Sequence, residues 1–173
     1  RPKLYTRGNG EIGLDISFLL DYIQGVPLEN DNVCNKDLIV RGELMIKKRD
    51  FEEYLKEKYN NARSAVASVV IAKERESKMD VIKYIRFISY EVISPRLKPE
   101  EQMRFLQNHD SFEVVYNKTL KHNELTNEYL SKILKRRREQ ETYNIDGIVV
   151  YQNEINPRKD ENPRHAFAFK MLL

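Results

Sequence analysis

The sequence is poor in metal-binding and redox-active side chains, with one cysteine and three histidines among 173 residues. A lone cysteine, Cys34, cannot form an internal disulfide, so we predict a surface thiol in a reducing compartment. One cysteine and three scattered histidines also exclude a structural zinc site with the usual four ligands.

Long hydrophobic runs are missing as well. No apolar stretch approaches the ~20 residues that a membrane-spanning helix needs, and the first residues lack the apolar segment of a secretory signal. We therefore expect a soluble, intracellular protein with no membrane partner. An apolar fraction of 40% is enough for one core, so the length predicts a single domain.

The charges nearly cancel, with 30 Lys and Arg against 27 Asp and Glu, so the net charge of +3 does not by itself indicate a nucleic-acid binder. The basic run at residues 135–138 has two interpretations, a phosphate-binding patch or a solvated helix end. The chain begins at Arg1 and not at Met, which suggests a piece of a longer protein.

Hydrophobic periodicity predicts a mixture of strands and helices. A short extended segment at residues 4–6 and a turn at residues 7–10 suggest a hairpin corner. Strands are expected at residues 38–46, 84–93, 112–116, 148–151 and 165–171, and helices at 15–23, 50–59, 62–73, 100–107 and 124–138. No regular βαβ repeat appears, so the prediction is an α+β fold, with mostly antiparallel sheets and flanking helices. Residues 153–163 are predicted to form a mobile loop or a lid.

Lys170 ends a strand with two dissimilar faces. Strand alternation places Phe167, Phe169 and Met171 on one face, where they are predicted to fill the core. Small alanines share the other face with Lys170, leaving room for a ligand whose phosphate the lysine can hold. The alternative is an edge-strand lysine that blocks aggregation.

Three other places carry candidate polar groups. Arg41 and Glu43 are expected on one strand face, as an anion and ribose site or as part of a cross-strand ion pair. Asp146 and Gly147 precede a strand, where they form a ligand contact or a plain turn. Arg63 at a helix start can bind an anion, or it is a routine surface arginine.

Taken in order, these motifs resemble the nucleotidyltransferase domain of the NAD-dependent DNA ligases. The stretches that carry the resemblance are LYTRGNG at residues 4–10, RGE at 41–43, NARSA at 61–65, YNIDGIVV at 143–150 and PRHAFAFK at 163–170. Arg138 also lies at the spacing before Asp146 at which the family places a functional arginine. The ligases of large DNA viruses resemble this sequence more than the bacterial consensus does.

The resemblance implies an ATP-grasp-like ligase fold, truncated at its N-terminus within residues 1–173. The strand with the family's adenylated lysine, in a Lys-x-Asp-Gly motif, and the accessory DNA-binding domains would lie outside this chain. We therefore expect the chain alone to be inactive. The parent enzyme would be an intracellular monomer, in the cytoplasm or in a viral factory if viral, acting in DNA repair and replication.

The family seals nicks in duplex DNA in three steps: AMP moves from NAD to a lysine, then to the 5′ phosphate of a nick, and is displaced by the 3′ hydroxyl. By resemblance, the catalytic residues are Glu43, Asp146 and Lys170, and Glu43 is also the expected Mg²⁺ ligand. Nucleotide contacts are expected from Arg7, Glu43, Asp146, Gly147, Tyr151 and Lys170, where Tyr151 replaces the lysine usual in the family. Arg63 and Arg138 are expected to serve the DNA-dependent steps.

Two alternatives remain at this point. One is an ATP-dependent polynucleotide ligase or capping-type nucleotidyltransferase from the same superfamily. The other is a non-enzymatic DNA-binding module with a decayed pocket, in which residues 135–138 hold DNA.

Overall fold

The computed structural model describes residues 1–27, 37–158 and 163–171. Its centre is a three-stranded sheet in the order β1-β2-β3, in which β1 (Ile39–Ile46) pairs antiparallel with β2 (Ile85–Ser94) and β3 (Glu113–Val114) runs parallel to β2. A second, two-stranded antiparallel sheet joins β4 (Ile148–Tyr151) to β5 (Ala166–Phe169). The predicted α+β fold with mostly antiparallel sheets is confirmed.

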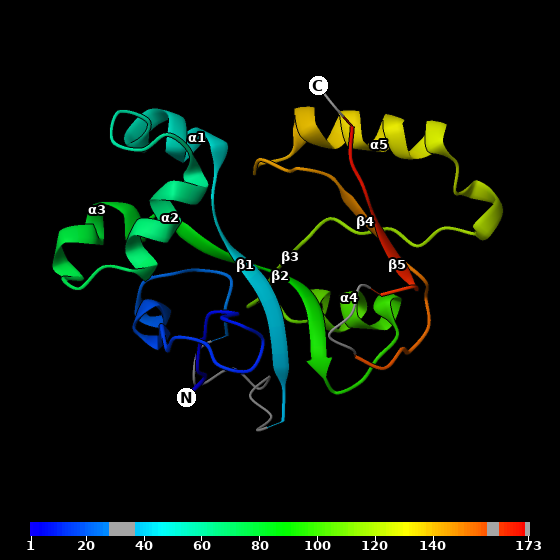
Figure 1. Cartoon of the computed structure of the whole chain (residues 1–173), viewed down its shortest axis with the longest axis horizontal. Helices are drawn as coiled ribbons and strands as arrows, with labels where there is room; N and C mark the ends of the chain where they lie inside the picture. The colour runs from blue at the N-terminus through cyan, green and yellow to red at the C-terminus, as the bar shows by residue number, and fades with distance from the viewer. Residues whose placement is uncertain (28–36, 159–162, 172–173) are drawn as a thin grey trace.

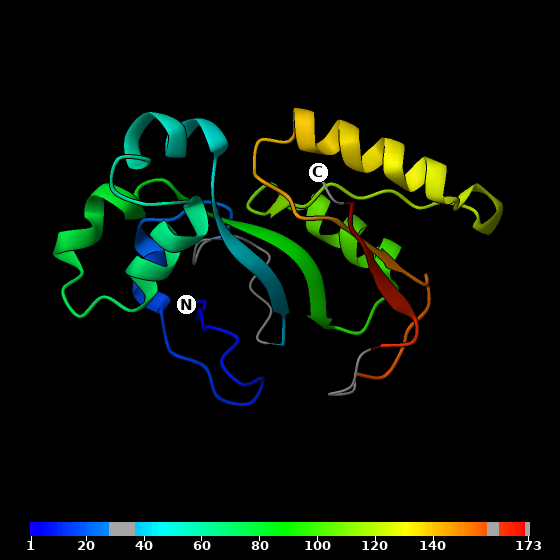
Figure 2. The same ribbon diagram turned by 45° about the horizontal axis from the view of Figure 1, so that its top comes forward.

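Helices flank these sheets (Figure 1). The chain also contains η1 (Ser17–Asp21), α1 (Lys48–Asp50), η2 (Phe51–Leu55), α2 (Ala62–Val70), η3 (Glu76–Lys78), α3 (Met79–Ile82), α4 (Pro99–Gln107), η4 (His122–Glu124) and α5 (Asn127–Gln140). Within the described residues, no helix is long and apolar enough to cross a bilayer. Figure 2 shows α1, α2 and α3 on one side of the central sheet, and α5 with the β4–β5 sheet on the other.

The main core lies between the central sheet and the N-terminal helices. It is built from the aliphatic and aromatic side chains of Ile16, Leu19, Ile23, Ile46, Leu55, Ala65, Val69, Val81, Ile82, Ile85 and Phe87. On β2, Phe87 and the next residue, Ile88, are both buried. Because neighbouring strand residues point to opposite faces, β2 is covered on both sides at this point.

Two helices begin with a side-chain cap, and a third begins with a proline. The Asn61 side chain accepts a hydrogen bond from the Ser64 backbone N–H at 2.8 Å, and Thr126 caps α5 in the same way through Tyr129. Pro99 occupies the first turn of α4, where its missing N–H costs nothing. These caps place α2 and α5 where the sequence predicts them, although α2 ends at Val70 and α5 begins at Asn127.

The segment that begins at Asp15 differs from the prediction. Its apolar residues Ile16, Leu19, Leu20 and Ile23 are buried as expected, but the only helix there is the 3₁₀ segment η1. Asp15 instead forms an antiparallel bridge with Tyr5, and the Ile16 N–H donates to the Leu4 carbonyl at 2.9 Å. The hairpin corner therefore uses the backbone of the residues expected to start the helix.

Other elements depart from their predicted lengths. The helix expected at residues 50–59 begins at Lys48 and ends in the π-helical turn η2 at Leu55. The predicted strand at 112–116 is confined to β3, and that at 165–171 to β5. Cys34 lies outside the described residues.

The prediction that Phe167 and Met171 fill the core is wrong. Phe167 is 49% exposed and Met171 is 37% exposed. In the described part of the chain, β4 and β5 pair only with each other. A two-stranded sheet of this kind leaves much of its surface uncovered.

Gly42 is fixed by the close pairing of β1 with β2. A Cβ atom at this position would lie 2.5 Å from the Ile88 carbonyl oxygen and 2.5 Å from the Phe87 ring. A backbone oxygen in a paired strand cannot move aside easily, so the pairing requires glycine here.

We predict that Gly42→Ala lowers the free energy of unfolding by about 1–3 kcal/mol, the usual cost of forcing extra atoms into a packed site. Urea unfolding measures the change. Glu43→Ala, at the exposed neighbouring position, is the control and should stay within about 0.5 kcal/mol of wild type. Equal unfolding midpoints for Gly42→Ala and wild type would contradict the close approach.

Candidate functional site

A cleft of about 2320 Å³ is lined by residues of the central sheet and of the β4–β5 sheet. Seven of the residues selected from the sequence line it, namely Arg41, Glu43, Arg63, Asp146, Gly147, Tyr151 and Lys170. Arg7 and Arg138 are not among the lining residues. The cleft therefore gathers side chains that are up to 129 positions apart, from Arg41 to Lys170.

On the β1 side, Arg41 and Glu43 have different partners. Arg41 lies opposite Glu91 of β2, and its guanidinium is 3.7 Å from the Glu91 carboxylate. Arg158 also forms an ion pair with Glu91. Among the described residues, the carboxylate of Glu43 has no ion pair or hydrogen bond, so it is available to a ligand.

Arg63 and Asp146 are joined directly. The Arg63 guanidinium lies 3.3 Å from the Asp146 carboxylate, with the two side chains 79% and 72% exposed. Exposed ion pairs of this kind contribute little free energy because water and salt screen them. Both side chains can therefore exchange this contact for a ligand at little cost.

Gly147 lies against the strand that carries Lys170. A Cβ at Gly147 would come within 2.5 Å of the Phe169 carbonyl oxygen and 2.8 Å of Lys170 Cγ. The sequence left a ligand contact or a plain turn open at this glycine, and the structure adds a close approach to the end of β5. The Lys170 side chain is exposed and forms no hydrogen bond or ion pair among the described residues, which leaves its ammonium group available to an anion.

Two tyrosines line the same cleft. Burial raises the pKa of Tyr90 and, likewise, that of Tyr151. Both residues are also partly exposed, at 38% for Tyr90 and 50% for Tyr151. Their aromatic surfaces are available for stacking with a planar ligand.

Tyr90 is a cleft residue that was not predicted from the sequence. It lies in β2 where the pairing with β1 is irregular, because Arg41 pairs with Glu91 while the adjacent Gly42 pairs with Ser89. This extra residue in β2 is a β-bulge, a feature that redirects side chains. Sequence alternation gives no sign of the bulge, so no local signal identified Tyr90.

Arg138 holds the ends of β4 and β5 together. Its guanidinium donates to the Asp146 carbonyl at 2.9 Å and to the Met171 carbonyl at 3.2 Å. These bonds lie at the entry to β4 and the exit from β5. In this structure Arg138 therefore contacts the backbone that carries Asp146 and Lys170.

The described start of the loop after β4 is anchored. Asn153 exchanges two hydrogen bonds with Glu100 at the start of α4, each 3.1 Å long. Further along, Arg158 binds Glu91 beside the cleft. The loop predicted at 153–163 thus has two fixed points before residue 159.

No cluster of three or more His, Cys, Asp or Glu side chains suited to a metal occurs in the described ranges. Glu43 is a carboxylate at the cleft that no ion pair occupies among the described residues, in contrast to Glu91. This fits Mg²⁺, which commonly binds through one or two carboxylates together with substrate phosphates.

We predict that Arg138→Ala lowers the thermal unfolding midpoint and speeds amide hydrogen exchange at Gly147 and Phe169, because two backbone carbonyls lose a charged donor. Hydrogen exchange read by mass spectrometry measures the effect. Arg136→Ala is the control, since Arg136 is exposed in the same basic run. If both variants behave alike, Arg138 does not hold the two strands.

Comparison with known proteins identifies the family of the chain. Residues 3–172 match the family model for the NAD-dependent DNA ligase adenylation domain. The chain is 36% identical over 173 residues to a DNA ligase of Acanthamoeba polyphaga mimivirus, covering 98% of this chain and 26% of the relative. It is 30% identical over 175 residues to the putative DNA ligase 205R of Invertebrate iridescent virus 6, with 98% and 28% covered.

A bacterial relative, a DNA ligase of Malacoplasma penetrans, is 29% identical over 178 residues, with 95% of this chain and 25% of the relative covered. The chain thus spans about a quarter of the length of these relatives. The match covers both sheets and the cleft between them, and the chain belongs to the NAD-dependent DNA ligase adenylation domain family.

Proposed function

We propose that the full-length protein is an NAD-dependent DNA ligase, an intracellular monomer that seals nicks in duplex DNA. The observation that carries this proposal is the gathering of Glu43, Asp146 and Lys170 around one cleft. Membership of the adenylation domain family supports NAD as the source of AMP.

The cleft has groups for each part of the AMP moiety of NAD. The exposed faces of Tyr90 and Tyr151 can stack with the adenine. Glu43 can accept a hydrogen bond from a ribose hydroxyl. Lys170 supplies a positive charge to the α-phosphate, with Asp146 and Gly147 close beside it.

Transfer begins when a lysine nitrogen attacks the α-phosphorus of NAD. A nitrogen–phosphorus bond forms, the bond to the bridging oxygen breaks, and nicotinamide mononucleotide leaves with that oxygen. No Lys-x-Asp-Gly motif occurs in the printed sequence, so we assign the nucleophile to another part of the protein. Lys170 would stabilise the negative charge that develops on the phosphoryl oxygens.

Glu43 is the residue that we propose to hold Mg²⁺, together with oxygens from the substrate phosphates. When bound, the ion would supply positive charge to the phosphoryl group. Since Glu91 is occupied by Arg41 and Arg158, it is a poorer ligand than Glu43.

We predict that Lys170→Ala in the full-length protein slows the addition of AMP from NAD by about a hundredfold to a thousandfold, the usual loss when a charge-stabilising donor is removed. Glu43→Ala should also slow it. Intact mass spectrometry with NAD and Mg²⁺ follows the covalent AMP. Lys132→Ala and Glu139→Ala, which are exposed on α5 and do not line the cleft, are the controls.

A wild-type protein that gains AMP from ATP and not from NAD would overturn the choice of donor. Gain from neither nucleotide, with salt-sensitive DNA binding retained, would favour a non-enzymatic DNA-binding module.

Arg63 is proposed to act in the DNA-dependent steps. Arg63→Ala should leave AMP addition from NAD unchanged and slow sealing of a pre-adenylated nick by about a hundredfold, because a cation beside the transferring phosphoryl group is lost. Gel analysis of nick closure measures this step. Arg49→Ala, at another exposed arginine outside the cleft, is the matched control. Slowed AMP addition in Arg63→Ala would place this residue in the first step instead.

A further inference from the structure

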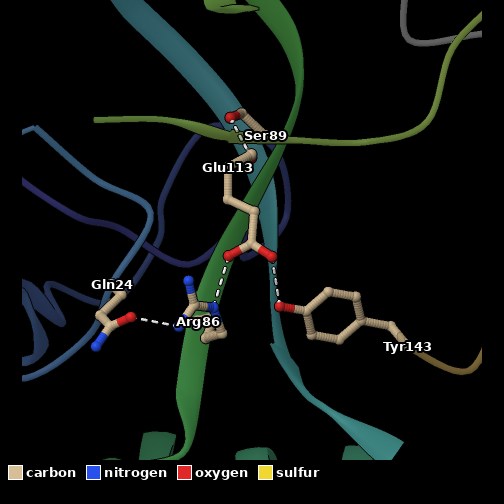
Figure 3. A network of polar contacts seen from close by, with 5 residues as sticks. All are labelled: Gln24, Arg86, Ser89, Glu113 and Tyr143. Atoms are coloured by element: carbon tan, nitrogen blue, oxygen red, sulfur yellow. Dashed lines mark hydrogen bonds and ion pairs between the residues drawn. The ribbon is translucent and has the colours of Figure 1, made fainter. Parts of the chain in front are cut away.

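The carboxylate of Glu113 joins distant segments of the chain (Figure 3). One oxygen accepts from Arg86 Nε at 2.6 Å, and the other accepts from the Tyr143 hydroxyl at 2.7 Å. Arg86 belongs to β2 and also donates to the Gln24 side chain. Tyr143 belongs to the segment that leads into β4. Glu113 therefore links the central sheet to the segment that enters the second sheet.

This network is partly shielded from water, and Tyr143 is buried. The side chains of Arg86 and Glu113 are only 25% and 29% exposed, and Tyr143 is 6% exposed. Burial, and then the hydrogen bond to Glu113, raise the pKa of Tyr143. The phenol therefore remains protonated at neutral pH and donates to the carboxylate.

Tyr143 lies just before the part of the cleft that carries Asp146 and Gly147. Two further bonds hold the same segment to the start of α1, just after β1, from Lys48 N to the Thr142 carbonyl and from Lys48 Nζ to the Arg138 carbonyl, both at 2.9 Å. Of these three bonds, the one from Tyr143 is the one that reaches β3, and through Glu113 it also reaches β2. It thus fixes the approach to β4 from a second direction.

We propose that Glu113 and Tyr143 are a positioning pair that sets where Asp146 and Gly147 stand relative to Glu43 across the cleft. The proposal rests on the proposed function, because its effect is on AMP transfer. Neither side chain needs to touch the nucleotide. Loss of the hydrogen bond between Tyr143 and Glu113 would leave the residues of both sheets in place within each sheet but would displace the two sheets relative to each other. Small displacements of reacting groups lower the reaction rate strongly.

Ser89 offers a matched control within the same network. Its hydroxyl is fully buried and donates to the Glu113 backbone carbonyl at 2.9 Å. This bond connects β2 to β3 and does not involve Tyr143. Ser89→Ala therefore weakens the network without cutting the link to β4.

The experiment uses the full-length protein, with NAD and Mg²⁺, and follows AMP addition by intact mass under single-turnover conditions. Tyr143→Phe removes the hydroxyl that donates to Glu113, and Glu113→Ala removes the carboxylate that joins Arg86 to Tyr143. In both variants we expect the rate at saturating NAD to fall by about tenfold to a hundredfold, with a much smaller change in the NAD concentration for half-maximal rate. Ser89→Ala should lower the thermal midpoint and keep the wild-type rate.

Glu113→Gln distinguishes position from charge. Its amide oxygen can accept from Arg86 while its NH₂ group donates to the Tyr143 oxygen, which preserves both contacts. We expect Glu113→Gln to recover most of the rate that Glu113→Ala loses. A glutamine variant as slow as the alanine variant would overturn the proposal, because charge would then be the requirement.

Hydrogen exchange at residues 144–148 gives a readout that does not depend on AMP transfer. Tyr143→Phe should speed exchange there, and Ser89→Ala should not. Wild-type AMP transfer in Tyr143→Phe, or unchanged exchange at residues 144–148, would overturn the positioning pair. If the wild-type protein gains no AMP from NAD, the proposed function fails. The exchange experiment then still tests whether the hydrogen bond between Tyr143 and Glu113 holds residues 144–148.

Discussion

The segment from Arg138 to Asp146 has to be held against the central sheet, because it carries the chain into β4 and so determines one wall of the cleft. Polar contacts hold it there. Lys48, just after β1, binds the backbone of this segment twice, and Glu113 of β3 accepts a hydrogen bond from the Tyr143 hydroxyl. Hydrogen bonds are directional, so they define the relative placement of the two sheets more sharply than apolar contact does.

The cleft combines side chains that are already paired with side chains that are available. Glu91 is occupied by two arginines, and Arg138 is committed to backbone carbonyls. Glu43 and Lys170 have no such partners among the described residues. Arg63 and Asp146 share a screened, exposed ion pair that can open at small cost. The committed groups shape the walls, and the available groups are the ones suited to meeting a charged nucleotide.

Much of the fold was predictable because its signals are local. The buried stripe in residues 16–23, the caps at Asn61 and Thr126, and the alternation in β1 each depend on residues within a few positions of one another. Predictions failed where a distant segment competes for the same groups. Asp15 bridges to Tyr5 and shortens the expected helix, and Phe167 stays exposed because β5 pairs only with β4 in the described chain.

The sequence by itself determined the family, the order of the motifs and the residues selected for the cleft. Each motif is a short run of neighbouring residues with a characteristic spacing, so it can be identified without the structure. The tertiary structure alone decided how those residues are used. It placed Tyr90 at a bulge beside Arg41, assigned Gly147 to the contact between β4 and β5, and turned Arg138 toward two carbonyls. Each of these outcomes depends on strand pairing or on contacts between segments far apart in the chain, and the residue pattern within one segment does not encode them.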